Sequence, residues 1–294
     1  MPDVVCDVDL LIVGAGPTGL FAAYYAGFRE LSVAVVDSLP EPGGQVTAMY
    51  PEKMIFDVAG FPAIRGRDLV NALVEQAAQW KPSYLLGRQA RELTESDGRF
   101  TVALADGSVA LASSILITAG IGEFRPRPLP AGDGWLGRGM VHFVPSLAAH
   151  EGQDVVVVGG GDSALDWVLA LHPIATSVTL VHRRAQFRAL PGSVRQVQEL
   201  GVPIITDAEV AEMRGDGTGL REVDVTVKGG DRITLPANAV VAALGFLADL
   251  GPIESWGLEL DHRAVAVDST MRTGRQRIYA AGDVATYPGK VKLI

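Results

Sequence analysis

Cysteine is nearly absent from this sequence of 294 residues, which contains Cys6 and no other. A single cysteine forms neither a disulfide within the chain nor a Cys-x-x-Cys redox couple. The histidines are scattered and lack the i, i+4 spacing of helical metal ligands, so we expect no metal site. These histidines are His142, His150, His172, His182 and His262.

Aromatic residues and positive charge are also scarce. Aromatics make up 6% of the chain and the formal net charge is -9, so we expect no non-specific binding to nucleic acid. No apolar run reaches the roughly 18 residues of a transmembrane helix, and we expect no membrane span. The first nine residues hold three aspartates and no Lys or Arg, which predicts a cytoplasmic protein without a secretory signal.

Glycine, in contrast, is abundant at 34 residues, and part of it lies in a repeated unit. The first copy has a predicted strand at 10–13, a glycine turn at 14–19, an apolar helix at 20–28 and a strand at 32–36. The same order recurs 145 residues later without a gap, so Asp37 corresponds to His182. The second copy has a strand at 155–158, a turn at 159–164, a helix at 165–171 and a strand at 178–181.

Each turn has the glycine spacing of a dinucleotide site between a strand and a helix. The first glycine permits the tight turn, the second lets the backbone approach a pyrophosphate, and the third position lets helix and strand pack closely. Glycine turns without a ligand are the alternative, but both copies keep the whole unit. The expected contacts are Gly14, Gly16, Pro17, Thr18 and Gly19 in the first turn, and Gly159, Gly161, Asp162, Ser163 and Ala164 in the second.

The residue that ends the second strand indicates which nucleotide each copy binds. Asp37 is suited to accept hydrogen bonds from two ribose hydroxyls and to repel a 2′-phosphate, which favours FAD or NAD(H). In the second copy His182 is followed by Arg183, Arg184 and Arg188, whose guanidinium groups match phosphate oxygens. This pattern favours NADPH, and a solvated basic face is the alternative. Two sites predict electron transfer between FAD and NADPH.

These motifs, together with segments 42–45, 118–120, 182–188 and 279–283, resemble the two-domain flavoprotein reductases of the thioredoxin reductase type. That group carries a Cys-x-x-Cys shortly before its second glycine motif. Here residues 141–147 read VHFVPSL, so no dithiol takes electrons from a flavin. Segments 49–53, 57–62 and 286–290 are more similar to the thioredoxin-reductase-like ferredoxin–NADP reductases, type 2.

The resemblance implies an α/β fold with two Rossmann-like three-layer domains, the second inserted into the first. We expect an FAD domain at 1–118 and 245–294 and an NADPH domain at 119–244. It also implies a homodimer that passes electrons from NADPH through FAD to ferredoxin or flavodoxin. Tyr50 would stack on the isoalloxazine ring, and no acid or base residue is assigned. The implied FAD contacts beyond the glycine turn are Asp37, Gly44, Gln45, Tyr50, Ala90, Phe124 and Asp283.

Two other functions fit the same motifs. One is an NADPH-dependent diaphorase that reduces quinones, flavins or ferric chelates, and the other is a redox sensor that binds both nucleotides without turnover. The resemblance also implies a helix and a flavin-covering segment after residues 288–290, so the sequence is expected to be short by these elements. Basic residues proposed to dock ferredoxin are Arg272, Arg275, Arg277, Lys290 and Lys292, with Arg65, Arg67, Arg88 and Arg91 as a weaker group.

Local patterns predict three further features. Residues 68–80 have the spacing of an amphipathic helix. Segments 99–104 and 108–111 flank Ala-Asp-Gly and are predicted to form a β-hairpin. Segments 222–227 and 232–235 flank two glycines and are predicted to form a second one.

Overall fold

The computed structural model describes residues 2–123, 125–247 and 249–290 and divides into two compact units. The first unit comprises Met1–Phe124 and Ala248–Ile294, and the second comprises Arg125–Leu247. The chain thus crosses between units at 124/125 and 247/248, where the sequence analysis expected 118/119 and 244/245.

The first unit is built on strand β1 (Val4–Val13), which pairs in parallel with β2 (Val33–Val36) and β8 (Val109–Ile117). β5 (Ser83–Leu85) extends this parallel sheet beside β2, and β21 (Ile278–Ala280) extends it beside β8. β6 (Ala90–Ser96) and β7 (Arg99–Leu104) add antiparallel strands. All four residues of β2 are buried, as is typical of a parallel strand that is covered on both faces.

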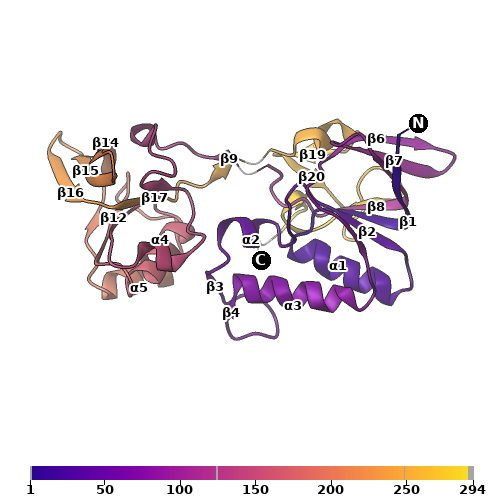
Figure 1. Cartoon of the computed structure of the whole chain (residues 1–294), viewed down its shortest axis with the longest axis horizontal. Helices are drawn as coiled ribbons and strands as arrows, with labels where there is room; N and C mark the ends of the chain where they lie inside the picture. Colours follow the sequence, from indigo (N-terminus) through magenta and orange to yellow (C-terminus); the bar gives the residue numbers. More distant parts are fainter. Residues whose placement is uncertain (1, 124, 248, 291–294) are drawn as a thin grey trace. The chain divides into compact units, whose positions relative to one another are not determined.

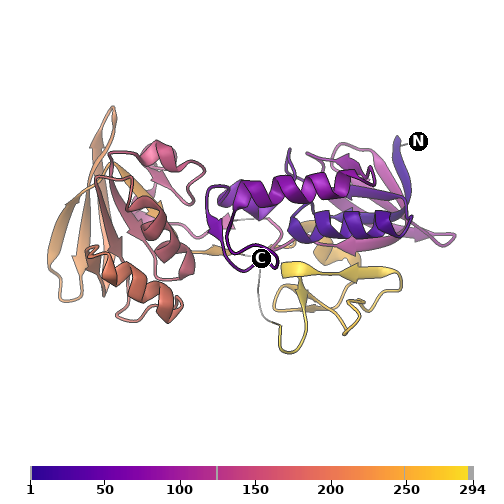
Figure 2. The ribbon, with the colours of Figure 1, turned by 90° about the horizontal axis from the view of Figure 1, so that it is seen from below.

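Helices α1 (Pro17–Phe28) and α3 (Gly66–Ala78) pack side by side on one face of that sheet (Figures 1 and 2). Ile12 faces these helices and is buried among Ala23, Ala26 and Ala77. Its neighbour Leu11 points to the opposite face, as alternate residues of a strand do, and packs in a core with strands β6 to β8. Helices, parallel sheet and antiparallel strands therefore form three layers.

The second unit repeats this plan. Its parallel sheet has the order β10 (Met140–Val141), β17 (Ala239–Ala242), β11 (Asp154–Val158), β12 (Ser177–Val181) and β13 (Ile204–Ile205). Helices α4 (Asp162–Leu171) and α5 (Pro191–Glu199) pack against each other, and α4 contacts β11 and β12 (Figure 1).

An antiparallel sheet forms the third layer of the second unit. It consists of β14 (Ala208–Asp216), β15 (Gly219–Val227) and β16 (Arg232–Pro236). Val156 and Val240 of the parallel sheet share a core with Val223 and Val225 of β15. The predicted fold class, two Rossmann-like three-layer domains with the second inserted into the first, is confirmed.

Short elements connect these layers. The helical ones are α2 (Gln45–Met49), η1 (Pro130–Gly132), η2 (Leu147–His150), η3 (Gly251–Trp256) and η4 (Gly282–Val284). The short strands are β3 (Met54–Ile55), β4 (Ile64–Arg65), β9 (Arg125–Pro126), β18 (Phe246–Leu247), β19 (Leu260–Asp261), β20 (Ala264–Ala266) and β22 (Ala285–Thr286).

Both predicted hairpins are confirmed, since β7 pairs antiparallel with β8 and β15 with β16. Several element bounds differ from the prediction. The helix expected at 68–80 is α3, which lies two residues earlier at each end. Helices α1 and α4 begin at Pro17 and Asp162, within the glycine turns, rather than at residues 20 and 165. Strand β1 begins at Val4 rather than at residue 10. Asp7 and Asp9 interrupt the apolar run of β1, which hid its first half.

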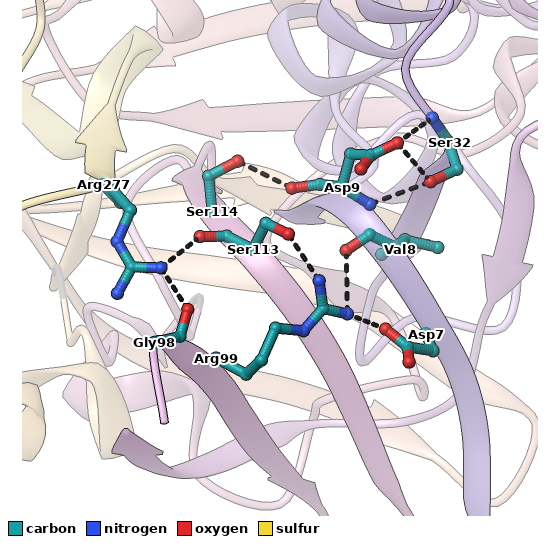
Figure 3. A network of polar contacts seen from close by, with 9 residues as sticks. All are labelled: Asp7, Val8, Asp9, Ser32, Gly98, Arg99, Ser113, Ser114 and Arg277. Atoms are coloured by element: carbon teal, nitrogen blue, oxygen red, sulfur yellow. Dashed lines mark hydrogen bonds and ion pairs between the residues drawn. The ribbon is translucent and has the colours of Figure 1, made fainter. Parts of the chain in front are cut away.

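The charged half of β1 is held by a polar network (Figure 3). Arg99 of β7 contacts the Asp7 carboxylate, the Val8 carbonyl and the Ser113 hydroxyl. The Asp9 carboxylate accepts a hydrogen bond from the Ser32 hydroxyl at 2.6 Å. The network joins β1 to β7 and β8 and explains how a strand with two aspartates lies in the middle of a sheet.

Trp256 is the largest fully buried side chain of the first unit, 2% exposed, and its Nε1 donates to the Arg91 carbonyl at 2.8 Å. We expect Trp256→Ala to lower the free energy of unfolding by about 3–5 kcal/mol, because it leaves a cavity and an unpaired carbonyl. Chemical denaturation followed by circular dichroism measures the change. The control Phe56→Ala removes a side chain that is 71% exposed and should change stability by no more than about 0.5 kcal/mol. Equal losses in the two variants would contradict the prediction.

Candidate functional site

The first glycine turn joins β1 to α1, and its glycines differ in the space that surrounds them. A Cβ atom on Gly14, whose φ is +116°, would lie 2.4 Å from the Thr118 carbonyl oxygen. A Cβ on Gly19 would lie 1.9 Å from the Gly14 carbonyl oxygen. Gly16, the N-cap of α1, would meet nothing within 4 Å. Two glycines are therefore required by packing, and Gly16 leaves open space at the helix N-terminus.

That open space belongs to a cavity of about 460 Å³ within the first unit. It lies where the strands of the parallel sheet end and α1 begins, so backbone N–H groups and the positive end of the helix dipole are close by. The predicted site residues that line it are Gly14, Gly16, Pro17, Thr18, Asp37, Gly44, Gln45, Tyr50, Ala90 and Asp283.

Two predicted contacts are not among the lining residues. Gly19 packs against Gly14 inside the turn instead. Phe124 lies outside the residues that the structure describes. Several further lining residues were not predicted as contacts of this site. Loops without a recognisable motif contribute Arg88, Gln89, Glu123 and Met271, and Tyr287 comes from segment 286–290, which carries part of the resemblance.

Asp37 binds the glycine turn directly. Its Oδ2 accepts a hydrogen bond from the Ala15 N–H at 2.6 Å, and its Oδ1 accepts one from the Leu39 N–H at 2.9 Å. Burial raises the pKa of Asp37, and these hydrogen bonds to the carboxylate oppose the shift. Asp37 thus fixes the turn against the end of β2 while it lines the cavity.

Gln45 and Tyr50 enter the cavity from α2 and its C-terminal end. The Gly43 N–H donates to the Ala15 carbonyl at 2.8 Å, which ties the start of α2 to the glycine turn. The Gln45 amide lies against Gly120, where a Cβ would come within 2.6 Å of its Nε2. Burial raises the pKa of the Tyr50 phenol to about 12, and the negative charges of Asp283 and Asp57 add to the shift. Tyr50 is therefore a neutral hydrogen-bond donor at physiological pH.

Asp283 reaches the cavity from η4, a tight turn that Lys290 stabilises. The Lys290 ammonium donates to the carbonyl oxygens of Gly282 at 2.7 Å and Ala285 at 2.6 Å. Gly282 has a φ of +79°, and a Cβ there would lie 2.8 Å from the Thr18 hydroxyl oxygen. The C-terminal segment of the first unit therefore returns to the glycine turn and completes the cavity wall.

The second glycine turn, between β11 and α4, has the same construction. Gly159 has a φ of +155°, and a Cβ on it would lie 2.4 Å from the Ala243 carbonyl oxygen. Gly161 is the N-cap of α4, and a Cβ on it would meet nothing within 4 Å. Ala164 is buried and Ser163 is exposed. The Asp162 carboxylate accepts a hydrogen bond from the Leu190 N–H at 2.8 Å.

The predicted basic residues follow β12 in a loop that folds back onto this turn. Arg183, Arg184 and Arg188 are exposed, and the Arg188 N–H donates to the Gly160 carbonyl at 2.8 Å. His182 differs from them, because it is 8% exposed and its ring stacks on Phe187 with centroids 5.1 Å apart. Burial lowers the pKa of His182, and the three arginines lower it further. The structure places His182 behind the turn rather than among the exposed arginines.

The geometry is that of two dinucleotide turns, and sequence comparison agrees. The model of the pyridine nucleotide-disulphide oxidoreductase family matches residues 8–293. The chain belongs to this family. The predicted family and oxidoreductase class are therefore confirmed, and the FAD and NADPH pair expected from the sequence is the pair of this family.

Individual relatives are similar over nearly the whole chain. A ferredoxin–NADP reductase of Saccharopolyspora erythraea is 71% identical over 100% of this chain and 90% of its own length. One of Halalkalibacterium halodurans is 45% identical over 97% of this chain and 88% of its own length. Among solved structures, a thioredoxin reductase of T. acidophilum superposes with a TM-score of 0.84 at 26% identity, covering 95% of this chain and 91% of that one.

The basic residues predicted to dock ferredoxin are mostly engaged within the first unit. Arg275 donates to the Trp256 carbonyl at 2.6 Å. Arg277 pairs with Glu95 at 2.5 Å and contacts the Gly98 and Ser113 carbonyls (Figure 3). Arg65 and Arg67 pair with Glu52, Arg88 pairs with Asp106, and Lys292 lies outside the described residues. These contacts hold loops and strands together, so the arginines named here serve the packing of the first unit.

Two negative findings concern the described part of the chain. Residues 2–123, 125–247 and 249–290 contain no group of three or more His, Cys, Asp or Glu side chains that could hold a metal ion. No helix within the same ranges has the length and apolar character needed to cross a bilayer.

Proposed function

We propose that this oxidoreductase is a ferredoxin–NADP reductase, in which FAD binds the first unit and NADPH binds the second. One observation carries the proposal: the chain has two dinucleotide turns with opposite charges beyond the second strand, a carboxylate at Asp37 and three exposed arginines at 183, 184 and 188. The names of the relatives support ferredoxin as the electron acceptor. We also propose flavodoxin as a second electron acceptor and a cytoplasmic location.

The cavity of the first unit fits FAD. The open space at Gly16 leaves room for a pyrophosphate at the N-terminus of α1, and a Cβ there would fill it. Asp37 lines the same cavity as an acceptor for ribose hydroxyls, and Asp283 lines it from η4 as an acceptor for the ribityl chain. The residues present therefore match the groups that FAD presents.

Three side chains position the reacting ring in this proposal. The Tyr50 ring provides a surface on which the isoalloxazine ring of FAD would stack with an offset. The Lys53 ammonium lies over the Tyr50 ring, with Nζ 5.6 Å from its centroid, and holds it by a cation–π contact. The Gln45 amide, held against Gly120, is placed to form a hydrogen bond with the polar edge of the isoalloxazine ring. The chemistry supplied by bound FAD is acceptance of a hydride equivalent and release of single electrons. The protein contributes orientation, so no acid or base residue is assigned.

The single cysteine separates this chain from thioredoxin reductases that share its fold. Cys6 lies in β1 and is half-buried, and burial raises the pKa of its thiol. A raised pKa disfavours the thiolate, which is the reactive form. Electrons therefore leave by a route other than a protein dithiol, which supports a separate redox protein as acceptor.

Anaerobic titration of the FAD-loaded protein with NADPH tests the function. We expect the flavin absorbance to bleach with NADPH, and added ferredoxin to restore it and to support reduction of cytochrome c. An unchanged flavin spectrum would falsify the proposal. Turnover with quinones or ferric chelates that does not increase with ferredoxin would assign the chain to the diaphorase class instead.

Nucleotide choice tests the second site. We expect the double substitution Arg183→Ala, Arg184→Ala to weaken NADP⁺ binding by about 1.5–3 kcal/mol for each charged hydrogen bond lost, with little effect on NAD⁺. Isothermal titration calorimetry with both nucleotides measures the difference. The matched control is Arg195→Ala, an exposed arginine of α5, which should leave both affinities unchanged. Equal weakening of NADP⁺ and NAD⁺ contradicts a 2′-phosphate site.

The homodimer implied by the resemblance is supported by an aromatic face on α1. Phe21, Tyr25 and Phe28 are 51%, 53% and 54% exposed, and Trp80 beside Phe28 is 42% exposed. Helix α1 contains no charged residue, so this face adds no charge repulsion between two copies of a protein with net charge -9. An aromatic side chain has about 150–250 Å² of surface, so these four half-exposed side chains expose roughly 300–500 Å² together. That is about half of the area that one partner buries in a stable interface.

We expect Phe21→Ser with Tyr25→Ser to convert the dimer to a monomer in sedimentation equilibrium, because aromatic side chains dominate interface cores. Phe56→Ser, in the loop between β3 and β4, is the matched control and should leave the dimer intact. A dimer that persists in the double variant, or a monomeric unsubstituted protein, contradicts this interface.

A further inference from the structure

Gly160 is a glycine that the dinucleotide turn does not require. The turn needs small residues at Gly159, Gly161 and Ala164, and position 160 accepts other residues in that motif. The φ of Gly160 lies outside the left-handed region, so its backbone conformation is open to any residue. The reason for glycine at this position must come from a neighbouring side chain.

That neighbour is His182. A Cβ on Gly160 would lie 2.2 Å from His182 Cε1 and 2.4 Å from each ring nitrogen. The imidazole is buried, and its ring stacks on Phe187 with centroids 5.1 Å apart. The ring therefore occupies the volume that an alanine methyl group at position 160 would need.

The two copies of the internal repeat differ at both of these positions. Positions 160 and 182 correspond to Ala15 and Asp37 in the first copy. There the carboxylate binds the Ala15 N–H at 2.6 Å from the side and leaves room for the methyl group. The first copy thus has a methyl group in the turn and a carboxylate after the second strand. The second copy has a glycine in the turn and an imidazole after the second strand.

The imidazole also sets the course of the basic loop, residues 183–188. His182 Nε2 lies 3.2 Å from the Gln186 carbonyl oxygen, within the loop. The loop then returns to the turn, where the N–H groups of Arg188 and Ala189 reach the Gly160 carbonyl at 2.8 and 3.3 Å. The ring lies between the turn and the loop, so its position fixes the distance between them.

We propose that Gly160 and His182 form a coupled pair that holds the basic loop over the second glycine turn and thereby determines selectivity for a 2′-phosphorylated nucleotide. In this role His182 is a positioning residue that acts through Arg183, Arg184 and Arg188. The inference rests on the proposed NADPH site. It assigns nucleotide choice to a contact behind the turn in addition to the exposed arginines.

Gly160→Ala tests the pair, with the dissociation constants of NADP⁺ and NAD⁺ measured by calorimetry on the FAD-loaded protein. The added methyl group must displace the ring and the loop. We expect the NADP⁺ constant to rise by at least about tenfold, as for the loss of one charged hydrogen bond. The NAD⁺ constant should change by no more than about twofold. The matched control is Gly161→Ala at the N-cap of α4, whose Cβ would meet no protein atom. Both nucleotides carry the pyrophosphate that binds at such a helix N-terminus, so both should weaken alike.

A double-mutant cycle separates the pair from a general structural effect. In a His182→Ala background the methyl group has room, so Gly160→Ala should cost no more than about twofold further in NADP⁺ affinity. An unchanged NADP⁺-to-NAD⁺ ratio in Gly160→Ala, or additive effects in the cycle, overturns the pair. An unsubstituted protein that binds neither nucleotide overturns the proposed function instead.

Discussion

The contact between a glycine turn and the side chain that follows the second strand is the constraint on which both units depend. In the first unit the Asp37 carboxylate binds the Ala15 N–H, and in the second unit the His182 ring packs against Gly160. The turn must be narrow enough for backbone groups to reach a pyrophosphate, and the strand end must place a charge near a ribose. In the first unit the Asp37 contact meets both requirements. In the second unit the His182 ring only packs against the turn, and the charge comes from the exposed Arg183, Arg184 and Arg188.

The layered fold supplies the positions for this contact. Parallel strands end at a common edge, so β1 and β2 bring residues 14 and 37 together, and β11 and β12 do the same for residues 159 and 182. Helices on one face and antiparallel strands on the other bury both sides of each sheet. The rigid sheet therefore carries the site, and the loops after the strands decide which ligand is bound.

The sequence was sufficient to predict the repeated unit, its fold class and most of the first cavity, because strand, turn and helix follow local rules. It was not sufficient for features that depend on distant residues. The Asp7–Arg99 pair that permits β1 to start at Val4 joins residues far apart in the chain. Arg277 was predicted to dock ferredoxin from its basic neighbours in sequence, but it pairs with Glu95 from another segment. Arg88 and Glu123 line the cavity from loops that carry no motif.

The same limit applies to His182. Its place after β12 suggested a nucleotide contact, and only the packing against Gly160 and Phe187 showed that its ring is buried. Glycine spacing in the sequence is therefore sufficient to predict a dinucleotide site, whereas the role of a single residue near the turn requires its contacts in the structure.

The most direct test of this account is an experimental structure of the protein with both FAD and NADP⁺ bound. The account predicts the FAD pyrophosphate at Gly16 with ribose hydroxyls on Asp37, and the NADP⁺ 2′-phosphate on Arg183, Arg184 and Arg188 with the His182 ring still against Gly160. Density for the 2′-phosphate elsewhere, or for either nucleotide in the opposite turn, would contradict it.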